Sequence, residues 1–320
     1  MTTYRQGQGY RIKLVDSDPD NAKVGQVWYN STELKIKGQL TIAAAWASGG
    51  NLNTGRTGLN GAGTKSAALA FGGNTPSLNE TEEYNGSSWS EQNNLNTGRF
   101  FAGGFGSQTA AVMAGGIVQT AGTRNLNNSE EYDGTSWTEG NNLNTGRDIL
   151  SGAGTLTAGL CFGGFEPGNS TKTEEYDGTS WSEQNDLSTA VRGSTRAGIQ
   201  TSALSFGGDS PAPGITTQTE EYDGTSWSSG GNYPVSQEAG GGSSGPQTAA
   251  LGFGGYTTAV CCKYDGSSWT TTASMSTARG GLNGDGTNDT SAIAFGGAPS
   301  RNITEEFTDT TNTARSFDVS

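Results

Sequence analysis

Six short apolar segments recur along the chain, and each ends in a pair of glycines. Residues 65–73 read KSAALAFGG, and residues 107–116 (SQTAAVMAGG) and 201–208 (TSALSFGG) repeat the pattern. Apolar runs of this length, bounded by glycine and polar residues, are typical of buried β-strands. The six predicted strands end at glycine pairs that begin at Gly72, Gly115, Gly163, Gly207, Gly254 and Gly296.

A hairpin sequence with a tryptophan accompanies the apolar strands at a nearly constant interval of 42–48 residues. It reads EEYDGTSW three times, and its Asp-Gly pair is typical of a tight turn. The many glycines exclude helical repeats, since glycine costs about 1 kcal/mol per helical position. Each repeat is therefore predicted to hold a glycine-rich strand such as 58–63, the apolar strand and the two hairpin strands, as in a propeller blade. The tryptophans are Trp46, Trp89, Trp137, Trp181, Trp227 and Trp269.

An arginine, mostly in the phrase LNTGR, precedes five of the repeats: Arg56, Arg99, Arg147, Arg192 and Arg279. The order of arginine, apolar strand ending in Gly-Gly, Tyr-Asp and tryptophan resembles the kelch repeat, across residues 40–320. The resemblance implies an all-β fold, a six-bladed kelch-type β-propeller with a short N-terminal β-hairpin extension. We expect residues 39–320 to form the propeller and residues 1–38 the extension.

The two ends of the repeat region are incomplete in complementary ways. Trp46 has no Glu-Glu-Tyr before it, and the last Glu-Glu-Phe, residues 305–307, has no tryptophan after it. We expect a strand of about residues 39–47 to complete the sixth blade and remove the open edge of the ring. In the alternative, residues 315–319 supply this fourth strand.

Five repeats carry two adjacent glutamates on the third strand, the first of each pair being Glu82, Glu130, Glu174, Glu220 and Glu305. Successive strand residues face opposite sides, and neighbouring blades cover both sides, so at least one glutamate per blade should be buried and need a partner. Paired carboxylates can serve acid–base catalysis. We favour a structural Arg–Glu ion pair within each blade, because the fifth repeat lacks both partners: residues 233–236 replace the arginine phrase, and Cys262 and Lys263 replace the glutamates.

Charge and composition exclude several functional classes. The chain has 18 basic and 31 acidic residues, a net charge of −13, which argues against nucleic acid and anionic membranes as partners. The longest apolar run, residues 40–47, is too short for membrane insertion. The chain has no histidine, which excludes His-dependent nucleophilic catalysis and argues against the usual zinc and copper sites, including that of the kelch-fold copper oxidases.

The remaining candidate groups have structural interpretations. We expect Cys161, Cys261 and Cys262 to pack within strands. Residues 284–286 (Gly-Asp-Gly) with Asp289 lack the six oxygen ligands of a calcium loop, and we interpret them as a polar turn. The sequence therefore predicts no enzyme, no catalytic or metal-binding residue and no cofactor.

The first 38 residues do not fit the repeat. Residues 25–32 (GQVWYNST), followed by Leu34 and Lys35, resemble a short segment near the N-terminus of structural and tail-fibre proteins of bacteriophages. GQVWYN and ELKIKG read as two strands around a polar turn, and such a hairpin can add to a sheet of another subunit. The resemblance implies a virion protein that binds other virion proteins through this segment. In the alternative, the segment is a simple extension covering the propeller.

We therefore expect a non-enzymatic bacteriophage virion structural protein, a tail- or fibre-associated propeller displayed to bind a host-surface protein or glycan. A capsid decoration protein and a cellular glycan- or protein-binding kelch adhesion module are the alternatives. Residues 1–10 contain no apolar stretch of the kind found in signal peptides, which fits synthesis in the host cytoplasm and a final location in the virion.

The loops between the second and third strands of the repeats differ most in length and chemistry. From the first repeat to the sixth, the segments between Gly-Gly and the glutamate position hold 8, 13, 9, 11, 6 and 7 residues. Variable loops on one face of a repeat protein often form its binding surface. The candidate contact residues are Arg124, Phe165, Ile215 and Tyr256. In the alternative, these loops vary because nothing contacts them.

Overall fold

The computed structural model describes residues 12–74, 78–119, 122–212, 214–236, 241–255 and 258–317. The chain forms two compact units, one of residues Trp46–Thr308 and one that combines Met1–Ala45 with Asp309–Ser320. Apart from the 3-10 turn Gln247–Ala249, all regular structure in the described residues is β. No helix within the described part of the chain is long and apolar enough to cross a membrane.

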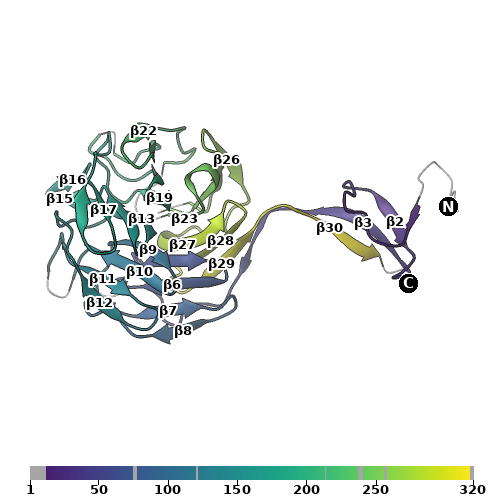
Figure 1. The fold of residues 1–320 in the computed structure, drawn as a ribbon, viewed down its shortest axis with the longest axis horizontal. Helices are drawn as coiled ribbons and strands as arrows, with labels where there is room; N and C mark the ends of the chain where they lie inside the picture. Colours follow the sequence, from purple (N-terminus) through teal and green to yellow (C-terminus); the bar gives the residue numbers. More distant parts are fainter. Residues whose placement is uncertain are drawn as a thin grey trace. The chain divides into compact units, whose positions relative to one another are not determined.

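The larger unit is a six-bladed β-propeller, with blades numbered here in chain order (Figure 1). Blade one contains β5 (Asn60–Thr64), β6 (Ala67–Phe71), β7 (Thr81–Tyr84) and β8 (Trp89–Gln92); blade two contains β9 (Gly103–Ser107), β10 (Ala110–Ala114), β11 (Ser129–Tyr132) and β12 (Trp137–Gly140); blade three contains β13 (Ser151–Thr155), β14 (Ala158–Phe162), β17 (Thr173–Tyr176) and β18 (Trp181–Glu183). Blade four contains β19 (Thr195–Ile199), β20 (Ser202–Phe206), β21 (Thr219–Tyr222) and β22 (Trp227–Ser229); blade five contains β23 (Gly242–Ser244), β24 (Ala250–Phe253), β25 (Cys261–Tyr264) and β26 (Trp269–Thr272); blade six contains β27 (Gly280–Asn288), β28 (Ser291–Ala298), β29 (Thr304–Thr308) and β4 (Ala45–Ser48).

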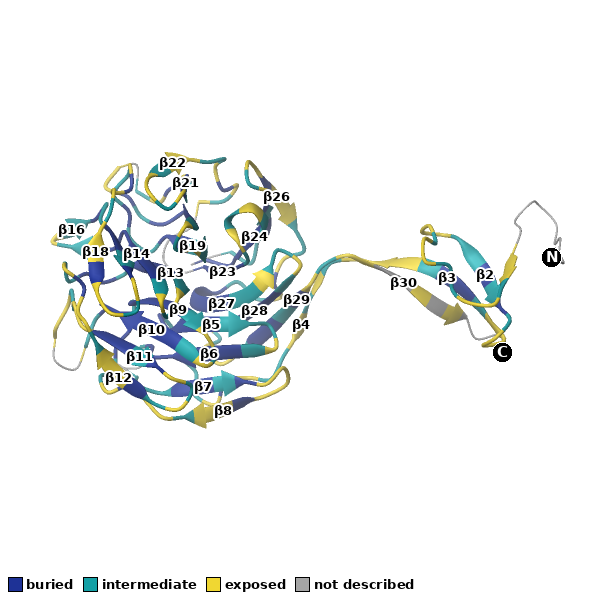
Figure 2. Ribbon diagram, viewed as in Figure 1, coloured by how far each residue is buried: buried dark blue, intermediate teal, exposed yellow. Residues whose placement is uncertain are grey.

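Small residues on the inner strands allow the blades to pack closely around the axis. A Cβ atom on Gly104 of β9 would lie 2.6 Å from the Cβ of Asn60 on β5, so only glycine fits there without displacing the next blade. The apolar second strands lie buried between neighbours, whereas the outer strands are largely exposed beyond their tryptophans (Figure 2). The core therefore consists of six interfaces between adjacent blades.

The ring closes with a strand from the N-terminal side, as predicted. The order of blade six is β27-β28-β29-β4, and β4 contains Trp46. Its indole donates a hydrogen bond to the carbonyl of Ala273 (3.0 Å), and its ring packs on Phe253 of blade five with centroids 5.0 Å apart. The closing strand is shorter than predicted, because residues up to Ile42 belong to a strand of the other unit.

The smaller unit is a four-stranded sheet in the order β1-β2-β3-β30. Its strands are β1 (Lys13–Val15), β2 (Val27–Asn30), β3 (Lys35–Ile42) and β30 (Thr311–Phe317). The predicted hairpin is present, since β2 and β3 pair antiparallel from Val27–Gly38 to Asn30–Lys35.

The C-terminal segment departs from the sequence prediction. β30 pairs with β3 over seven residue pairs, from Ile36–Phe317 to Ile42–Thr311. The described part of 315–319 therefore lies outside blade six, and the propeller ends at Thr308 instead of continuing to residue 320. The predicted boundary at 38/39 was also wrong, since the smaller unit extends to Ala45. Pairing with β30 holds the whole of β3 in this unit.

A polar cluster around Asp18 organises this sheet. Trp28, which is fully buried, and Asn30 donate hydrogen bonds to Asp18 Oδ1 at 3.0 and 2.9 Å, and Lys37 Nζ lies 2.7 Å from Asp18 Oδ2. The hydrogen bond from Lys37, with those from Asn30 and Trp28, lowers the pKa of Asp18 to about 2. The residues of the VWYN phrase thus fix the loop between β1 and β2.

Candidate functional site

The Arg–Glu pairs are buried structural links in four blades, as predicted. Arg56 Nη2 lies 2.7 Å from Glu82 Oε1, and neither side chain is exposed. Arg56 Nη1 also donates to the carbonyls of Gly72 and Glu80, while Glu82 accepts the backbone N–H of Asn53. Each pair therefore joins the loop entering its blade to the loop after the second strand. The same contacts recur for Arg99–Glu130, Arg147–Glu174 and Arg279–Glu305.

The prediction for Arg192 was wrong. The N–H of Gly164 donates to the carbonyl of Val191, as the N–H of Gly116 does to that of Arg147, so Val191 occupies the arginine position. Arg192 lies one residue later and pairs with Asp209 at 2.6 Å. Aligning LSTAV with LNTGR would have revealed this shift.

The second of the two adjacent glutamates on each third strand forms a link between blades that the sequence analysis missed. Tyr132 of blade two donates its hydroxyl proton to Glu83 of blade one at 3.2 Å. The same bond joins Tyr176 to Glu131, Tyr222 to Glu175, Tyr264 to Glu221 and Tyr84 to Glu306. Burial and the adjacent Glu306 raise the pKa of Tyr84 to about 12, so the phenol remains a donor.

The sixth interface replaces this hydrogen bond by another interaction. Blade five has Lys263 at the glutamate position, and blade six has Phe307 at the tyrosine position. Lys263 Nζ lies 5.9 Å from the centre of the Phe307 ring, within the range of a cation–π contact, and 3.3 Å from Asp289. Both positions of this interface therefore differ from those of the other five interfaces.

In blade five Cys262 takes the glutamate position, whereas the residue at the arginine position, 237, lies outside the described residues. Tyr233 packs against Phe206 and Trp269, with ring centroids 5.0 and 4.8 Å apart, and Cys262 belongs to the same buried cluster. Cys161 and Cys261 are also buried free thiols, as the prediction of strand packing requires. Burial raises the pKa of Cys161 to about 12, which keeps it in the unreactive thiol form.

Two candidate contact residues lie together on the face of the propeller formed by the loops between the second and third strands. The guanidinium of Arg124 in blade two lies 5.2 Å from the centre of the Phe165 ring in blade three. Two hydrogen bonds of 2.9 Å from Arg124 to the buried Asp148 fix this position, and half of the arginine side chain remains exposed. Phe165 lies at the start of β15 (Phe165–Glu166), which pairs with β16 (Gly168–Asn169).

The contact series continues into blade four. Arg192 lies 5.5 Å from the centre of the same Phe165 ring, and it pairs with Asp209. Asp209 forms a β-bridge with Ile215, whose side chain is 45% exposed. We call Arg124, Phe165, Arg192 and Ile215 the loop surface. The fourth candidate, Tyr256, lies outside the described residues.

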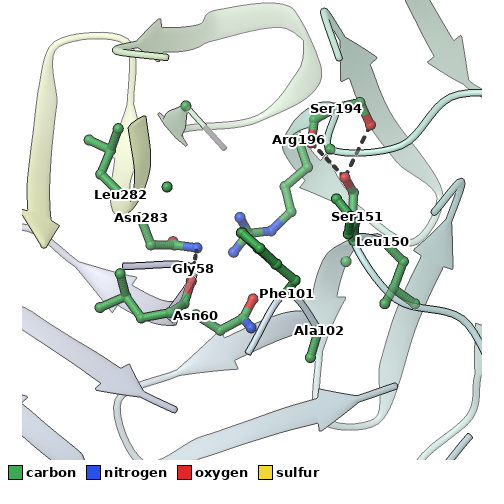
Figure 3. Close-up of a pocket in the computed structure, with 16 residues that line it drawn as sticks. Gly58, Asn60, Phe101, Ala102, Leu150, Ser151, Ser194, Arg196, Leu282 and Asn283 are labelled. Carbon is green, nitrogen blue, oxygen red and sulfur yellow. Dashed lines mark hydrogen bonds between the residues drawn. The ribbon is translucent and has the colours of Figure 1, made fainter. Parts of the chain in front are cut away.

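A second feature, absent from the sequence predictions, is an axial pocket of about 60 Å³. It lies where the inner strands begin, at the end of the propeller that carries the loop surface. Its lining comes from several blades and includes Asn60, Phe101, Ser151, Arg196 and Asn283. Figure 3 shows the side chain of Arg196 extending into this pocket towards the strands that carry Asn60 and Asn283. The side-chain nitrogen of Asn60 is buried without a hydrogen-bond partner.

A series of backbone hydrogen bonds between neighbouring blades runs along the wall of the pocket. Gly58 N donates to Gly281 O (2.7 Å), Phe101 N to Gly58 O (2.9 Å), Ile149 N to Phe101 O (2.7 Å) and Gly193 N to Ile149 O (2.8 Å). Each of these five residues has a positive φ, 53° for both Phe101 and Ile149. Left-handed backbone is costly for a β-branched residue such as Ile149, and the inter-blade bond accounts for it.

Arg196 and Asp285 form the charged part of the axis. A wider cavity of about 360 Å³ at the other end of the inner strands is lined by both residues. Arg196 donates to the carbonyl of Gly61 across the axis (3.3 Å), whereas Asp285 Oδ2 is buried without a hydrogen-bond partner. Burial raises the pKa of Asp285 to about 7, against the opposing effect of Arg196. The predicted polar turn at 284–286 was wrong, because these residues continue β27 along the axis.

The two features suit different ligands. The loop surface offers guanidinium, aromatic and aliphatic groups, which favour contact with a protein surface. The axial pocket offers amide and guanidinium donors, which suit a small polar or anionic ligand. Within the described residues, no group of three or more cysteine, aspartate or glutamate side chains is placed to hold a metal ion.

Comparison with known proteins supports the fold. No family model matches the chain, and no curated protein matches its sequence. Among solved structures, the chain is similar to the one named "Structure of YjhT", with a TM-score of 0.70 and 13% sequence identity. The alignment covers 83% of this chain and all of that one. At this identity the likeness concerns the fold alone.

Proposed function

We propose that this chain is a kelch-type propeller of a bacteriophage virion, a non-enzymatic structural protein associated with the tail or a fibre. In this proposal the smaller unit binds other virion proteins, and the propeller binds a protein or glycan on the host surface. The loop surface carries the proposal. It gathers two arginines, a phenylalanine and an exposed isoleucine from three consecutive blades on the face with the most variable loops.

The smaller unit supports the attachment role. The segment that resembles phage structural proteins contributes Trp28 and Asn30, which hold Asp18 and the loop before β2. Within the unit, Leu14 of β1 is 42% exposed and Leu40 of β3 is 42% exposed. A small sheet with exposed aliphatic residues suits docking against a partner.

The first experiment locates the protein. Purified phage particles labelled with antibody against the propeller are imaged by electron microscopy. Label at the tail or fibres supports the proposal, label over the capsid favours a decoration protein, and particles without label contradict a virion role.

The second experiment tests the loop surface. Phe165→Ala combined with Ile215→Ala should lower attachment to host cells at least tenfold while leaving the circular dichroism spectrum and Tm unchanged. Ile199→Ala is the matched control, since Ile199 is 52% exposed at the end of β19, on the opposite face. Equal attachment by the double variant and the control would place the binding surface elsewhere.

The axial pocket favours a second candidate, binding of a small polar ligand such as the end of a glycan. Arg196 and the amides of Asn60 and Asn283 provide the hydrogen-bonding groups. A glycan array read with the wild type and with Asn60→Ala tests this role. Binding lost in Asn60→Ala but kept in the loop-surface variant would assign recognition to the pocket.

A further inference from the structure

Blade four retains the buried glutamate but not its arginine. An aliphatic side chain, Val191, occupies the position that an arginine holds in blades one, two, three and six. Glu220 is 5% exposed and occupies the place of Glu82, Glu130, Glu174 and Glu305. It accepts the N–H groups of Ser188 and Thr189 at 2.8 and 3.1 Å, as Glu130 accepts those of Asn96 and Thr97. The blade has therefore kept its loop geometry while Val191 has replaced the arginine.

The replacement removes a positive charge from a buried carboxylate. In blade three, Arg147 Nη2 lies 2.9 Å from Glu174 Oε1. In blade four, the remaining donors to Glu220 are the two N–H groups and the Ser188 hydroxyl at 2.8 Å, and no lysine or arginine of the described chain forms an ion pair with it. An ionised carboxylate without a cation is costly in such a place. Blade five avoids this cost because it lacks the glutamate as well.

A cavity lies where the guanidinium would be. It is lined by Val191, Glu220, Gly207, Gln218, Ser205 and Thr216, and about 10 Å³ of it is open to a water-sized sphere. In blade three, Arg147 Nη1 donates to the carbonyls of Gly163 and Lys172, both at 2.8 Å. Gly207 and Gln218 hold the equivalent positions, since Gly207 N bonds to Gln218 O as Gly163 N bonds to Lys172 O.

We propose that this cavity is a binding site for a monovalent cation of about the size of potassium or ammonium, which takes the place of the guanidinium. The carboxylate of Glu220 and the carbonyls of Gly207 and Gln218 supply oxygen ligands, and the hydroxyls of Ser205 and Thr216 line the same cavity. One carboxylate balances one positive charge, whereas calcium sites in proteins commonly use several carboxylates. The volume suits a single ion of the size of a water molecule.

Thermal unfolding of the full chain tests the proposal. Replacing about 100 mM tetramethylammonium chloride, whose cation is too large for the cavity, by potassium chloride should raise the Tm by about 2 °C or more, because a ligand that binds only the folded state stabilises it. Val191→Arg, which restores the side chain present in four other blades, should abolish this response. Glu220→Gln should abolish it as well.

Crystals soaked in thallium acetate provide a measurement that does not depend on how stable the variants are. The expected result is an anomalous peak beside Glu220 in the wild type and no peak there in Val191→Arg. An equal potassium response in the wild type and Val191→Arg, or a cavity whose density shows only water without anomalous signal, would overturn the proposal.

Discussion

Single residues decide how each blade neutralises its buried carboxylate. Four blades use an arginine that also binds two carbonyl groups, and the fifth lacks both charged partners, with Cys262 at the glutamate position in a buried cluster that includes Tyr233. Such an ion pair gains little over a well-packed apolar alternative, but removal of one partner leaves an isolated buried charge. Side chains at these positions are therefore coupled within a blade.

Replacing one partner of a buried pair should be much worse than replacing both. Arg147→Met leaves Glu174 buried without its guanidinium and should lower the free energy of unfolding by about 3–5 kcal/mol, as measured by urea denaturation. Adding Glu174→Met should recover most of this loss. Lys172→Ala, which removes the partly exposed pair with Glu166, is the control and should cost less than about 1 kcal/mol. A loss in the double variant equal to that in Arg147→Met would contradict this account.

Asp285 should make the stability depend on pH. Its folded-state pKa of about 7 lies above its ordinary value of 3.8, so the folded protein keeps a proton that the unfolded chain releases in this range. Its contribution to the free energy of unfolding therefore falls as the pH rises from about 4 to about 7. Asp285→Asn should match the wild type in urea at pH 4 and exceed its stability at pH 7.5. The same difference at both pH values would exclude titration of this group.

At the scale of elements, neighbouring blades are joined by contacts that repeat around the ring. A tyrosine of one blade bonds a glutamate of the blade before it at five interfaces, and Lys263 and Phe307 form the sixth contact. The closing strand β4 completes blade six by joining β29. The ring thus depends on a short strand far from the rest of its blade in the sequence.

The contribution of β4 is testable by truncation. A chain that starts at residue 45 keeps the strand and should unfold at a Tm within about 3 °C of the full-length propeller transition. A chain that starts at residue 49 loses Trp46 and exposes the edge of β29, and its Tm should fall by at least about 8 °C. Differential scanning calorimetry measures both. Equal Tm values for the two truncations would mean that β4 does not stabilise the ring.

The sixth interface should be convertible to the form of the other five. Lys263→Glu alone places a carboxylate beside Phe307 and near Asp289, and it should destabilise the protein. Phe307→Tyr combined with Lys263→Glu supplies the missing hydroxyl, and the double-mutant cycle should give a favourable coupling of about 1 kcal/mol in urea denaturation. Additive single effects would show that the two positions act independently.

For the whole molecule, the propeller separates a variable face from a uniform one. The loops after the second strands carry Arg124, Phe165 and Ile215 of the loop surface, and Arg192 precedes β19. The turns between the third and fourth strands repeat one Asp- or Asn-capped geometry, as in the bonds from Thr135 N and Ser136 N to Asp133. Uniform turns offer little to distinguish partners. We therefore assign recognition to the variable face in the proposed virion role.

Exchange of a whole loop tests this assignment. Replacing residues 117–129 of blade two by the blade-six segment 298–304 should leave the Tm within about 3 °C and lower attachment to host or neighbouring subunit, because Arg124 is lost. The turn 85–88 of blade one, exchanged for 133–136 of blade two, is the control. Attachment that survives shortening of the loops of blades two, three and four together would contradict the assignment.

Local patterns in the sequence determined the strands, the six blades, the closing strand with Trp46 and four of the buried ion pairs. Each of these follows from residues within one repeat, or from complementary gaps at the ends of the repeat series. A pairing inside a repeat uses short chain separations, such as Arg56 with Glu82, and the period of the sequence keeps its register visible. The prediction failed at Arg192 because a one-residue shift preserves the residue type but changes the side-chain position.

Only the tertiary structure showed which residues distant in the sequence lie side by side. The axial pocket draws residues as far apart as Asn60 and Asn283, and no local pattern marks them as neighbours. The sequence offered residues 315–319 only as an alternative fourth strand of blade six, whereas the C-terminal strand pairs with β3 along seven residue pairs. The cavity beside Glu220 likewise depends on the tertiary structure, because the replacement of an arginine by Val191 leaves a cavity only when the surrounding carbonyl groups keep their places.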